Sequence, residues 1–437
     1  MDQKSSSSDD LLAIREEVRR NETYYLDLLA EAVRISFSSL AAFQSWVGEK
    51  MRQIGLQVDE FIVDREELAN QPAGQKTLRE NPSALQSGPN IVGRLTGQDS
   101  ARGLLLFAHA DKFPETFDWG RKHPDMIERE GRLFAPGIAD DVSGVAAMLS
   151  AVETLFRLGF ELKVDLMAAS VLGKQMSLYG TYGLMSRFGP MDAAIYVHPA
   201  ESGDGLSEIH MASNGMIEFL IEIEGKPPDT SDPFQIIYPK STVSAAEKGV
   251  YLFEGLHEWA VVASNRYRHL GLEKLTGQAL ALLVARFSTG TENLTYEIPL
   301  RCILEGTVSF PPNASLASVQ DDFQAAFKRL VEQDPWLADA HAHFEWGDNI
   351  GESGQSDEQS ALLLMASQVL TEVTGRQPHY FYGHALSDIR YPLLYWNAQA
   401  FGLGPVCGDI GKESEWVDRK EYLDTIVAVT QMLKQVG

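Results

Sequence analysis

Cysteine is scarce in this sequence, which has only Cys302 and Cys407 among its 437 residues. Two cysteines cannot build a disulfide framework, and these two lack the spacing of metal ligands, so we expect a reducing compartment. Long apolar runs are also lacking. No stretch of about 18 apolar residues occurs, and residues 1–10 contain no apolar core of signal-peptide length. We therefore expect a soluble, cytoplasmic protein.

Basic residues are in short supply as well, with 37 Lys and Arg against 61 Asp and Glu and a formal net charge of −24. This balance argues against nucleic acid and against anionic membrane surfaces as partners. The composition is otherwise that of a globular protein, with 44% hydrophobic and 22% charged residues. The chain is too long for one ordinary core, so we expect two domains.

Strand-like and helical patterns alternate in the first half of the chain. Strands are expected over 90–95, 103–108, 162–170 and 193–197, and helices over 142–159 and 180–188. Such alternation is typical of a mostly parallel sheet.

Near residue 213 the rhythm changes to that of an α+β domain. Strands are expected there over 217–224, 292–299 and 302–309, and helices over 243–258, 274–286 and 316–331. We therefore predict an α/β protein whose mostly parallel-sheet domain (1–212 and 341–437) is interrupted by a smaller α+β domain over 213–340.

Two short motifs carry the chemistry. The apolar run from Leu104 ends in His109 and Asp111, and a Gly-rich turn then presents Asp140 and Asp141. A strand that delivers His-x-Asp at its end feeds a site at the carboxyl edge of an open sheet. Taken singly, His109 is interpreted as a core histidine and Asp140 as a helix cap. Together, imidazole and carboxylate predict a metal site, with zinc as the matching ion.

The order of the motifs resembles that of the dinuclear-zinc amidohydrolases and exopeptidases, the family of acetylornithine deacetylase, succinyl-diaminopimelate desuccinylase, aminoacylase and bacterial glutamate carboxypeptidase. The resemblance covers most of the chain. It rests on His109-Ala-Asp111, Gly137–Asp141 with Gly144, Asp192–Pro199, Gly383–Arg390, and Phe401–Pro405 before Glu415-Trp-Val417. It implies that 1–212 and 341–437 form the catalytic domain and that 213–340 is the lid (dimerisation) domain. It also implies hydrolysis of an amide, N-acyl amino acid or peptide-like small molecule by a homodimer.

The resemblance also implies a ligand set for one zinc ion, formed by His109, Asp140 and His198. His198 stands where the family has Glu or Asp before Pro, and imidazole and carboxylate both bind zinc. On its own, a His before Pro is also compatible with a capping or core role. Asp111 is expected to orient His109 through the other ring nitrogen.

The sequence departs from the family at the second metal. Matching the family's Glu-Glu motif to residues 174–180 puts Lys174 in the place of the general base and Gln175 in that of a metal ligand. Gly411 stands where a late His ligand is expected, and Asp229 where the lid has its histidine. No Glu occurs between Leu162 and Ala200 and no His after His384, so no shift of register restores these groups. We expect one zinc ion per chain at most, or none.

Three interpretations stay open. In the first, a mononuclear metalloenzyme uses Lys174 as a base or as an oxyanion partner, with Glu201 as a substitute base. In the second, the chain is a catalytically silent homologue that binds a small ligand or a partner. In the third, it is a metal-independent acyl-transfer or amide-forming enzyme whose pocket is shaped by residues 118–125. The groups missing from the family pattern include the ligands of the second metal and the general base, whereas the ligand set of the first metal is complete. This favours the first interpretation, the mononuclear metalloenzyme.

Overall fold

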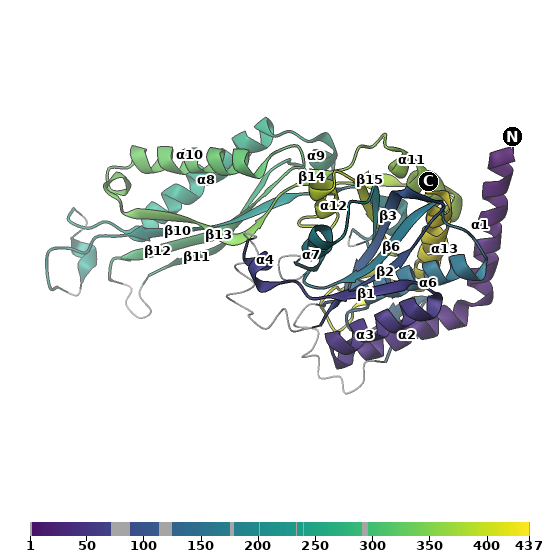
Figure 1. Cartoon of the computed structure of the whole chain (residues 1–437). Coiled ribbons are helices and arrows are strands. Elements are labelled where there is room, and N and C mark those ends of the chain that lie inside the picture. Colours follow the sequence, from purple (N-terminus) through teal and green to yellow (C-terminus); the bar gives the residue numbers. More distant parts are fainter. Residues whose placement is uncertain are drawn as a thin grey trace. The chain divides into compact units, whose positions relative to one another are not determined.

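The computed structural model describes residues 2–70, 88–112, 125–174, 179–200, 202–232, 234–238, 240–290 and 296–436. The chain forms two compact units (Figure 1). Unit 1 comprises Met1–Ala212, Gln355–Phe381 and Asp388–Gly437, and unit 2 comprises Ser213–Gly354 and Tyr382–Ser387. Of the expected pocket segment 118–125, only Asp125 lies within the described residues.

Unit 1 is built around an eight-stranded sheet with the order β1-β2-β6-β3-β7-β16-β8-β15. Its four central strands run parallel: β6 (Val164–Val171), β3 (Asp99–His109), β7 (Ala193–Val197) and β16 (Gln399–Leu403). The flanking strands are β1 (Gln57–Phe61), β2 (Asn90–Leu95), β8 (Glu208–His210) and β15 (His379–Phe381). Pairing is antiparallel between β1 and β2, β2 and β6, and β8 and β16. The predicted α/β class with a mostly parallel central sheet is confirmed.

Helices cover both faces of this sheet (Figure 1). On one face α6 (Ser143–Arg157) is buried along nearly its whole length, because it contacts β3 as well as neighbouring helices. The helices around it are α1 (Asp2–Arg20), α2 (Glu22–Ser38), α3 (Leu40–Ile54) and α13 (Arg419–Gln435), and α11 (Ala361–Thr374) contacts α13. On the other face α7 (Tyr179–Arg187) and α12 (Arg390–Tyr395) pack on Leu105, Phe107 and Tyr196. A short helix, α4 (Arg65–Ala69), follows β1.

A second, small sheet in unit 1 joins distant parts of the sequence. Its order is β17-β18-β5-β4, formed by β4 (Ile127–Arg129), β5 (Arg132–Phe134), β17 (Cys407–Gly408) and β18 (Trp416–Asp418). The pairing of β18 with β5 brings Glu415 beside the turn that precedes α6, where the backbone N–H of Ala135 donates to the Glu415 carbonyl.

Unit 2 is a four-stranded antiparallel sheet with the order β11-β12-β10-β13. Its strands are β10 (Gly215–Glu224), β11 (Ala281–Thr289), β12 (Arg301–Phe310) and β13 (Ala342–Gly351). Alternate residues of β10, from Ile217 to Ile223, are buried, and with residues of α8 (Ala245–Arg266) and α10 (Leu316–Gln333) they form one apolar core. This is the two-layer α+β arrangement that the sequence rhythm predicted.

Three details of unit 2 differ from the sequence-based prediction. The prediction of a helix over 274–286 is wrong. The helix α9 (Leu270–Thr276) is capped at its C-terminal end by Gly277, and the strand β11 follows. Residues 296–299 of the strand expected over 292–299 are not in a strand, and residues 292–295 lie outside the described ranges. Unit 2 also continues past the expected boundary at 340 to Gly354, because β13 pairs with β10.

None of the helices in the described ranges combines the length and the apolarity needed to cross a bilayer. Cys302 and Cys407 are both free thiols.

Candidate functional site

Four side chains that the sequence singled out meet at the carboxyl edge of the unit 1 sheet. His109 ends β3, Lys174 comes shortly after β6, and His198 follows β7 directly, so three neighbouring parallel strands deliver these side chains to one edge. Asp140 lies in the segment Ile138–Val142 that leads into α6, and its backbone angles (φ −129°, ψ 82°) are not helical. The side chain of Lys174 is only 11% exposed, so this residue is not a surface cation.

One carboxylate oxygen, Asp140 Oδ1, is the centre of this cluster. It lies 2.8 Å from His109 Nε2, 3.1 Å from His198 Nε2 and 3.0 Å from Lys174 Nζ. Lys174 Nζ is also 2.9 Å from His198 Nε2. The two imidazole rings stack at 5.4 Å between centroids. The sequence-predicted ligands His109, Asp140 and His198 are therefore brought together, with the Lys174 ammonium group among them.

Backbone carbonyls fix the orientation of both imidazoles. His109 Nδ1 lies 3.0 Å from the carbonyl oxygen of Asp111, and His198 Nδ1 lies 2.9 Å from that of Pro199. A carbonyl oxygen only accepts, so each Nδ1 carries the hydrogen and donates it. The Nε2 atoms of both rings then point at Asp140, which is the orientation that metal-binding histidines show.

The charged groups in this cluster shift one another's pKa values. Burial opposes a charge on His109, but the Asp140 carboxylate outweighs it and raises the pKa of His109 to about 10. Burial likewise opposes the charge on Asp140, but the Lys174 ammonium and His109 hold the pKa of Asp140 well below its usual range. In the absence of another cation, His109 is protonated and donates to Asp140, while His198 accepts from Lys174.

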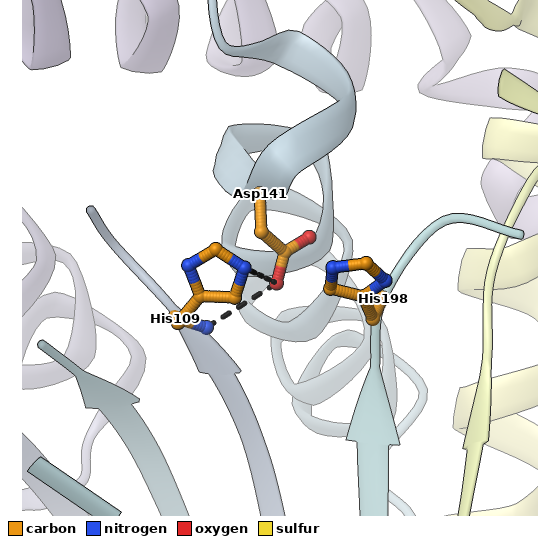
Figure 2. Close-up of side chains that lie close together, drawn as sticks. All are labelled: His109, Asp141 and His198. Carbon is orange, nitrogen blue, oxygen red and sulfur yellow. Dashed lines mark hydrogen bonds and ion pairs between the residues drawn. The ribbon is translucent and has the colours of Figure 1, made fainter. Parts of the chain in front are cut away.

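Asp141 also lies between the two histidines, and a ligand oxygen of Asp141 is within 4.8 Å of ligand nitrogens of both rings (Figure 2). Both of its oxygens already accept backbone hydrogen bonds, from the N–H of His109 at 3.2 Å and of Gly144 at 3.1 Å. Burial raises the pKa of Asp141 well above the usual value. Its closer oxygen is 4.0 Å from His109 Nε2, so Asp140 is the better placed carboxylate ligand and Asp141 joins β3 to α6.

Asp111 lies at the ring nitrogen of His109, as expected from the sequence, and it also has a second task. The group that holds His109 Nδ1 is its backbone carbonyl, while its carboxylate oxygen Oδ1 is 3.6 Å from that nitrogen. The same Oδ1 accepts the backbone N–H of Gly173 at 2.9 Å and of Lys174 at 3.2 Å. The Asp111 carboxylate thus fixes the turn that carries Lys174.

Glu415 is a site residue that the sequence analysis used only as a motif landmark. Its carboxylate is buried and accepts the backbone N–H groups of Gly137, Ala139, Asp140 and Gly411 at distances between 2.7 and 3.3 Å. Gly411, at the place of the family's late histidine, takes part only through its backbone. Burial raises the pKa of Glu415 to about 7 despite these donors.

We expect Glu415 to make stability fall as the pH rises from 4.5 to 7. Over this range the folded state holds a proton on Glu415 that the unfolded state has lost, so the free energy of unfolding decreases with pH and levels off above 7. The decrease is on the order of 1–3 kcal/mol. Urea unfolding at several pH values measures it. Glu415→Gln should remove this part of the slope, whereas Glu49→Gln, exposed on α3, should keep it. An unchanged slope in Glu415→Gln would contradict this assignment.

Another buried carboxylate, that of Asp388, is connected to the cluster through Tyr196. It accepts from the hydroxyls of Thr181 and, at 3.4 Å, Tyr196, and burial raises the pKa of Asp388. The Tyr196 ring in turn stacks on His198 at 5.1 Å between centroids. Asp388 belongs to the motif Gly383–Arg390, which located it in the sequence without indicating its task.

The residues present fit one metal ion. Two Nε2 atoms, each fixed through Nδ1, and one carboxylate oxygen converge on the same place, which is the donor set of a catalytic zinc site with open positions. Two described positions supply no donors for a second ion: Lys174 offers no lone pair while it donates to its two neighbours, and Gly411 has no side chain. Gln175 and Glu201 lie outside the described residues.

Comparisons with known proteins support the motif-based resemblance. The model of Peptidase family M20/M25/M40 matches residues 105–435. N-formyl-4-amino-5-aminomethyl-2-methylpyrimidine deformylase of Bacillus subtilis is 26% identical over 317 residues, which are 70% of this chain and 66% of that protein. The deformylase of the same name from Halalkalibacterium halodurans is 25% identical over 368 residues, covering 78% and 81% of the two chains.

Solved structures share the fold at low identity. A tripeptidase from Staphylococcus aureus superposes with a TM-score of 0.71 at 16% identity and covers 95% of this chain and 98% of its own. The Bacillus subtilis YXEP protein, a dinuclear metal binding peptidase, superposes with a TM-score of 0.63 at 13% identity, covering 95% and 98%.

Proposed function

Because this chain belongs to Peptidase family M20/M25/M40, we propose that it hydrolyses the amide C–N bond of a small N-acyl compound. Hydrolysis of amide C–N bonds is the reaction class that the motifs predicted, and the family agrees with it. The observation that carries the proposal is the convergence of His109, His198 and Lys174 on one oxygen of Asp140 at the edge of the sheet.

We propose that His109, Asp140 and His198 hold a single divalent ion, with zinc as the ion that suits two imidazoles and a carboxylate. When bound there, it supplies Lewis acidity toward an amide carbonyl. Asp111 and Pro199 keep the two rings aimed at the site through their backbone carbonyls. Glu415 accepts the backbone N–H groups of Ala139 and Asp140, and Asp141 accepts that of Gly144, so the two carboxylates hold the backbone around Asp140.

Lys174 is better placed as a hydrogen-bond donor than as a base. Its ammonium group donates to Asp140 and His198, whereas a general base has to present a lone pair to the substrate or to water. A donor at this position stabilises the negative charge that develops on the carbonyl oxygen during amide hydrolysis. Glu201, three residues after His198, remains our proposal for the base.

The two curated relatives point to the acyl group of the substrate. Both are named for removing a formyl group from the amine of a substituted pyrimidine. We therefore propose that this chain acts on an N-formyl or other short N-acyl amine rather than on a long peptide. The silent-homologue and amide-forming interpretations are outcomes of the same test.

This function is tested by measuring the release of formate or of another acid when the wild-type protein is incubated with a panel of substrates. The panel contains N-formyl-4-amino-5-aminomethyl-2-methylpyrimidine, N-acyl amino acids and dipeptides, each with and without added ZnCl₂. If Lys174 is a donor, Lys174→Arg should retain activity within about tenfold and Lys174→Ala should lose about 10²–10³-fold in kcat, because Arg keeps the charge. If it is a base, both variants should be equally poor, because Arg does not give up its proton.

Absence of turnover on the whole panel, with ligand binding and melting temperature unchanged in Lys174→Ala, would favour a silent homologue. Formation of an amide from the free acid and amine would instead favour the amide-forming enzyme.

We also propose a homodimer formed through unit 2. Its edge strand β11 leaves Leu283 63% exposed and Phe287 40% exposed, which is unusual for apolar side chains on a free sheet edge. Sedimentation equilibrium distinguishes the chain mass of 48.4 kDa from twice that value, and a monomer at micromolar concentration would contradict the proposal.

A further inference from the structure

We infer that the Lys174 ammonium group is a built-in cation of this site and competes with the divalent ion for the same two atoms. The inference rests on the proposed ligand set but not on the proposed reaction. Lys174 Nζ lies 3.0 Å from Asp140 Oδ1 and 2.9 Å from His198 Nε2, two of the three atoms assigned to the metal. An ion bound by those two atoms and the ammonium group therefore require the same space.

The buried carboxylate of Asp140 explains why a positive charge is needed there. Asp140 Oδ1 lies 2.8 Å from His109 Nε2 and 3.1 Å from His198 Nε2, and all three side chains are buried. Burying a carboxylate without a compensating positive charge is costly. His109 and Lys174, which both contact Asp140 Oδ1, supply that charge from within the chain, so the carboxylate is compensated without an ion from solution.

The backbone around Lys174 is built to hold the side chain in place. The Asp111 carboxylate accepts the N–H groups of Gly173 and Lys174, which fixes the turn after β6. Gly173 has a φ of +89°, and a Cβ there would lie 2.3 Å from the Tyr179 ring. The turn therefore requires glycine at 173 and starts the Lys174 side chain from a fixed backbone position.

Charge makes the competition unfavourable for the metal. With Lys174 in place, the carboxylate of Asp140 already contacts the Lys174 ammonium group as well as the His109 ring. A divalent ion added beside that ammonium group faces Coulomb repulsion in a buried site, where charges are poorly screened. The metal therefore binds tightly only if Lys174 leaves Asp140 and His198, and the lysine lowers the affinity of the site for metal.

Zinc and cobalt binding to lysine variants tests this inference. The proteins are the full-length wild type, Lys174→Met, Lys174→Ala and the control Lys163→Met, whose lysine is exposed at the start of β6. Titration with ZnCl₂ alone, and the visible absorption of bound Co²⁺, report affinity and coordination without any substrate. We expect Lys174→Met to bind Zn²⁺ about 100-fold more tightly than wild type at one ion per chain, and Lys163→Met to match wild type.

A second measurement uses the space that Lys174→Ala leaves open. Methylammonium chloride should weaken Zn²⁺ binding to Lys174→Ala, because the small cation takes the place of the missing ammonium group, and should leave wild-type binding unchanged. NaCl at the same ionic strength is the control for screening.

The inference is wrong if wild type and both Lys174 variants bind Zn²⁺ with affinities within threefold of each other, or if methylammonium acts no differently from NaCl. If Lys174→Met does not fold, Lys174→Ala with methylammonium decides the question. Failure of the proposed function appears differently, as the absence of amide hydrolysis in proteins whose metal affinities follow the predicted order.

Discussion

Replacing His109 with Ala is expected to abolish tight Zn²⁺ binding and to lower kcat/KM for any amide substrate by about 10²–10³-fold. His109 supplies one of the two ring nitrogens that converge on Asp140, and His198 is the one other described histidine in this cluster. Equilibrium dialysis with metal analysis measures the binding, and the substrate panel measures the turnover. His343→Ala, exposed on β13 of unit 2, is the matched control and should change neither quantity.

The same dialysis counts the ions. We expect saturation at one zinc ion per chain in wild type and in Lys174→Met, because Asp140 is the one residue of the second ligand set that the sequence retains. Two tightly bound zinc ions per chain would mean that a second ligand set exists, supplied either by residues outside the described ranges or by Asp204, Glu208 and His379, whose ligand atoms lie within 4.8 Å of one another. Full zinc binding by His109→Ala would instead move the metal away from this cluster.

Replacing Asp140 with Asn is expected to destabilise the protein more than any other single substitution in the site. The change leaves His109 and Lys174 facing each other without the carboxylate that both contact. Removing one partner from a buried ion pair costs about 3–5 kcal/mol. Urea unfolding without metal measures the loss. Asp59→Asn breaks the exposed pair between Asp59 and Arg94 and is expected to cost less than about 1 kcal/mol.

The double variant Asp140→Asn/Lys174→Met tests the cause of that loss. If the unpaired ammonium group is responsible, removing it restores part of the stability, and the two substitutions are strongly non-additive. Simple additivity of the two losses would show that Asp140 and Lys174 do not stabilise each other and would contradict the geometry of the cluster.

The sheet of unit 1 was largely predictable, because its central strands are buried on both faces and appear in the sequence as short apolar runs. The runs at 103–108, 162–170 and 193–197 correspond to β3, β6 and β7. The edge strands of unit 2 were not predictable in the same way. In β11, a run such as Ala281–Val284 is compatible with helix or strand, and pairing with β12 decides between them.

The candidate site was predictable to the level of residue type and position. His109 and Asp140 were selected because a strand and a Gly-rich turn deliver them, and His198 and Lys174 because the family resemblance places them at a ligand and at the base position. The four side chains do lie together. The roles within the cluster depend on distances of a few ångströms, which spacing in the sequence does not encode. The choice between Asp140 and Asp141, the use of the Asp111 carbonyl, and the reach of Lys174 to His198 are of this kind.

The position of β16 in the middle of the unit 1 sheet has a consequence for synthesis on the ribosome. β7 ends at Val197, and its partner β16 begins at Gln399, about 200 residues later, with nearly all of unit 2 encoded between them. At about 5–20 residues per second, the exposed edge of β7 waits roughly 10–40 s for its neighbour. Throughout that interval the nascent chain presents an unpaired, apolar strand edge beside His198, where it is open to pairing with other chains.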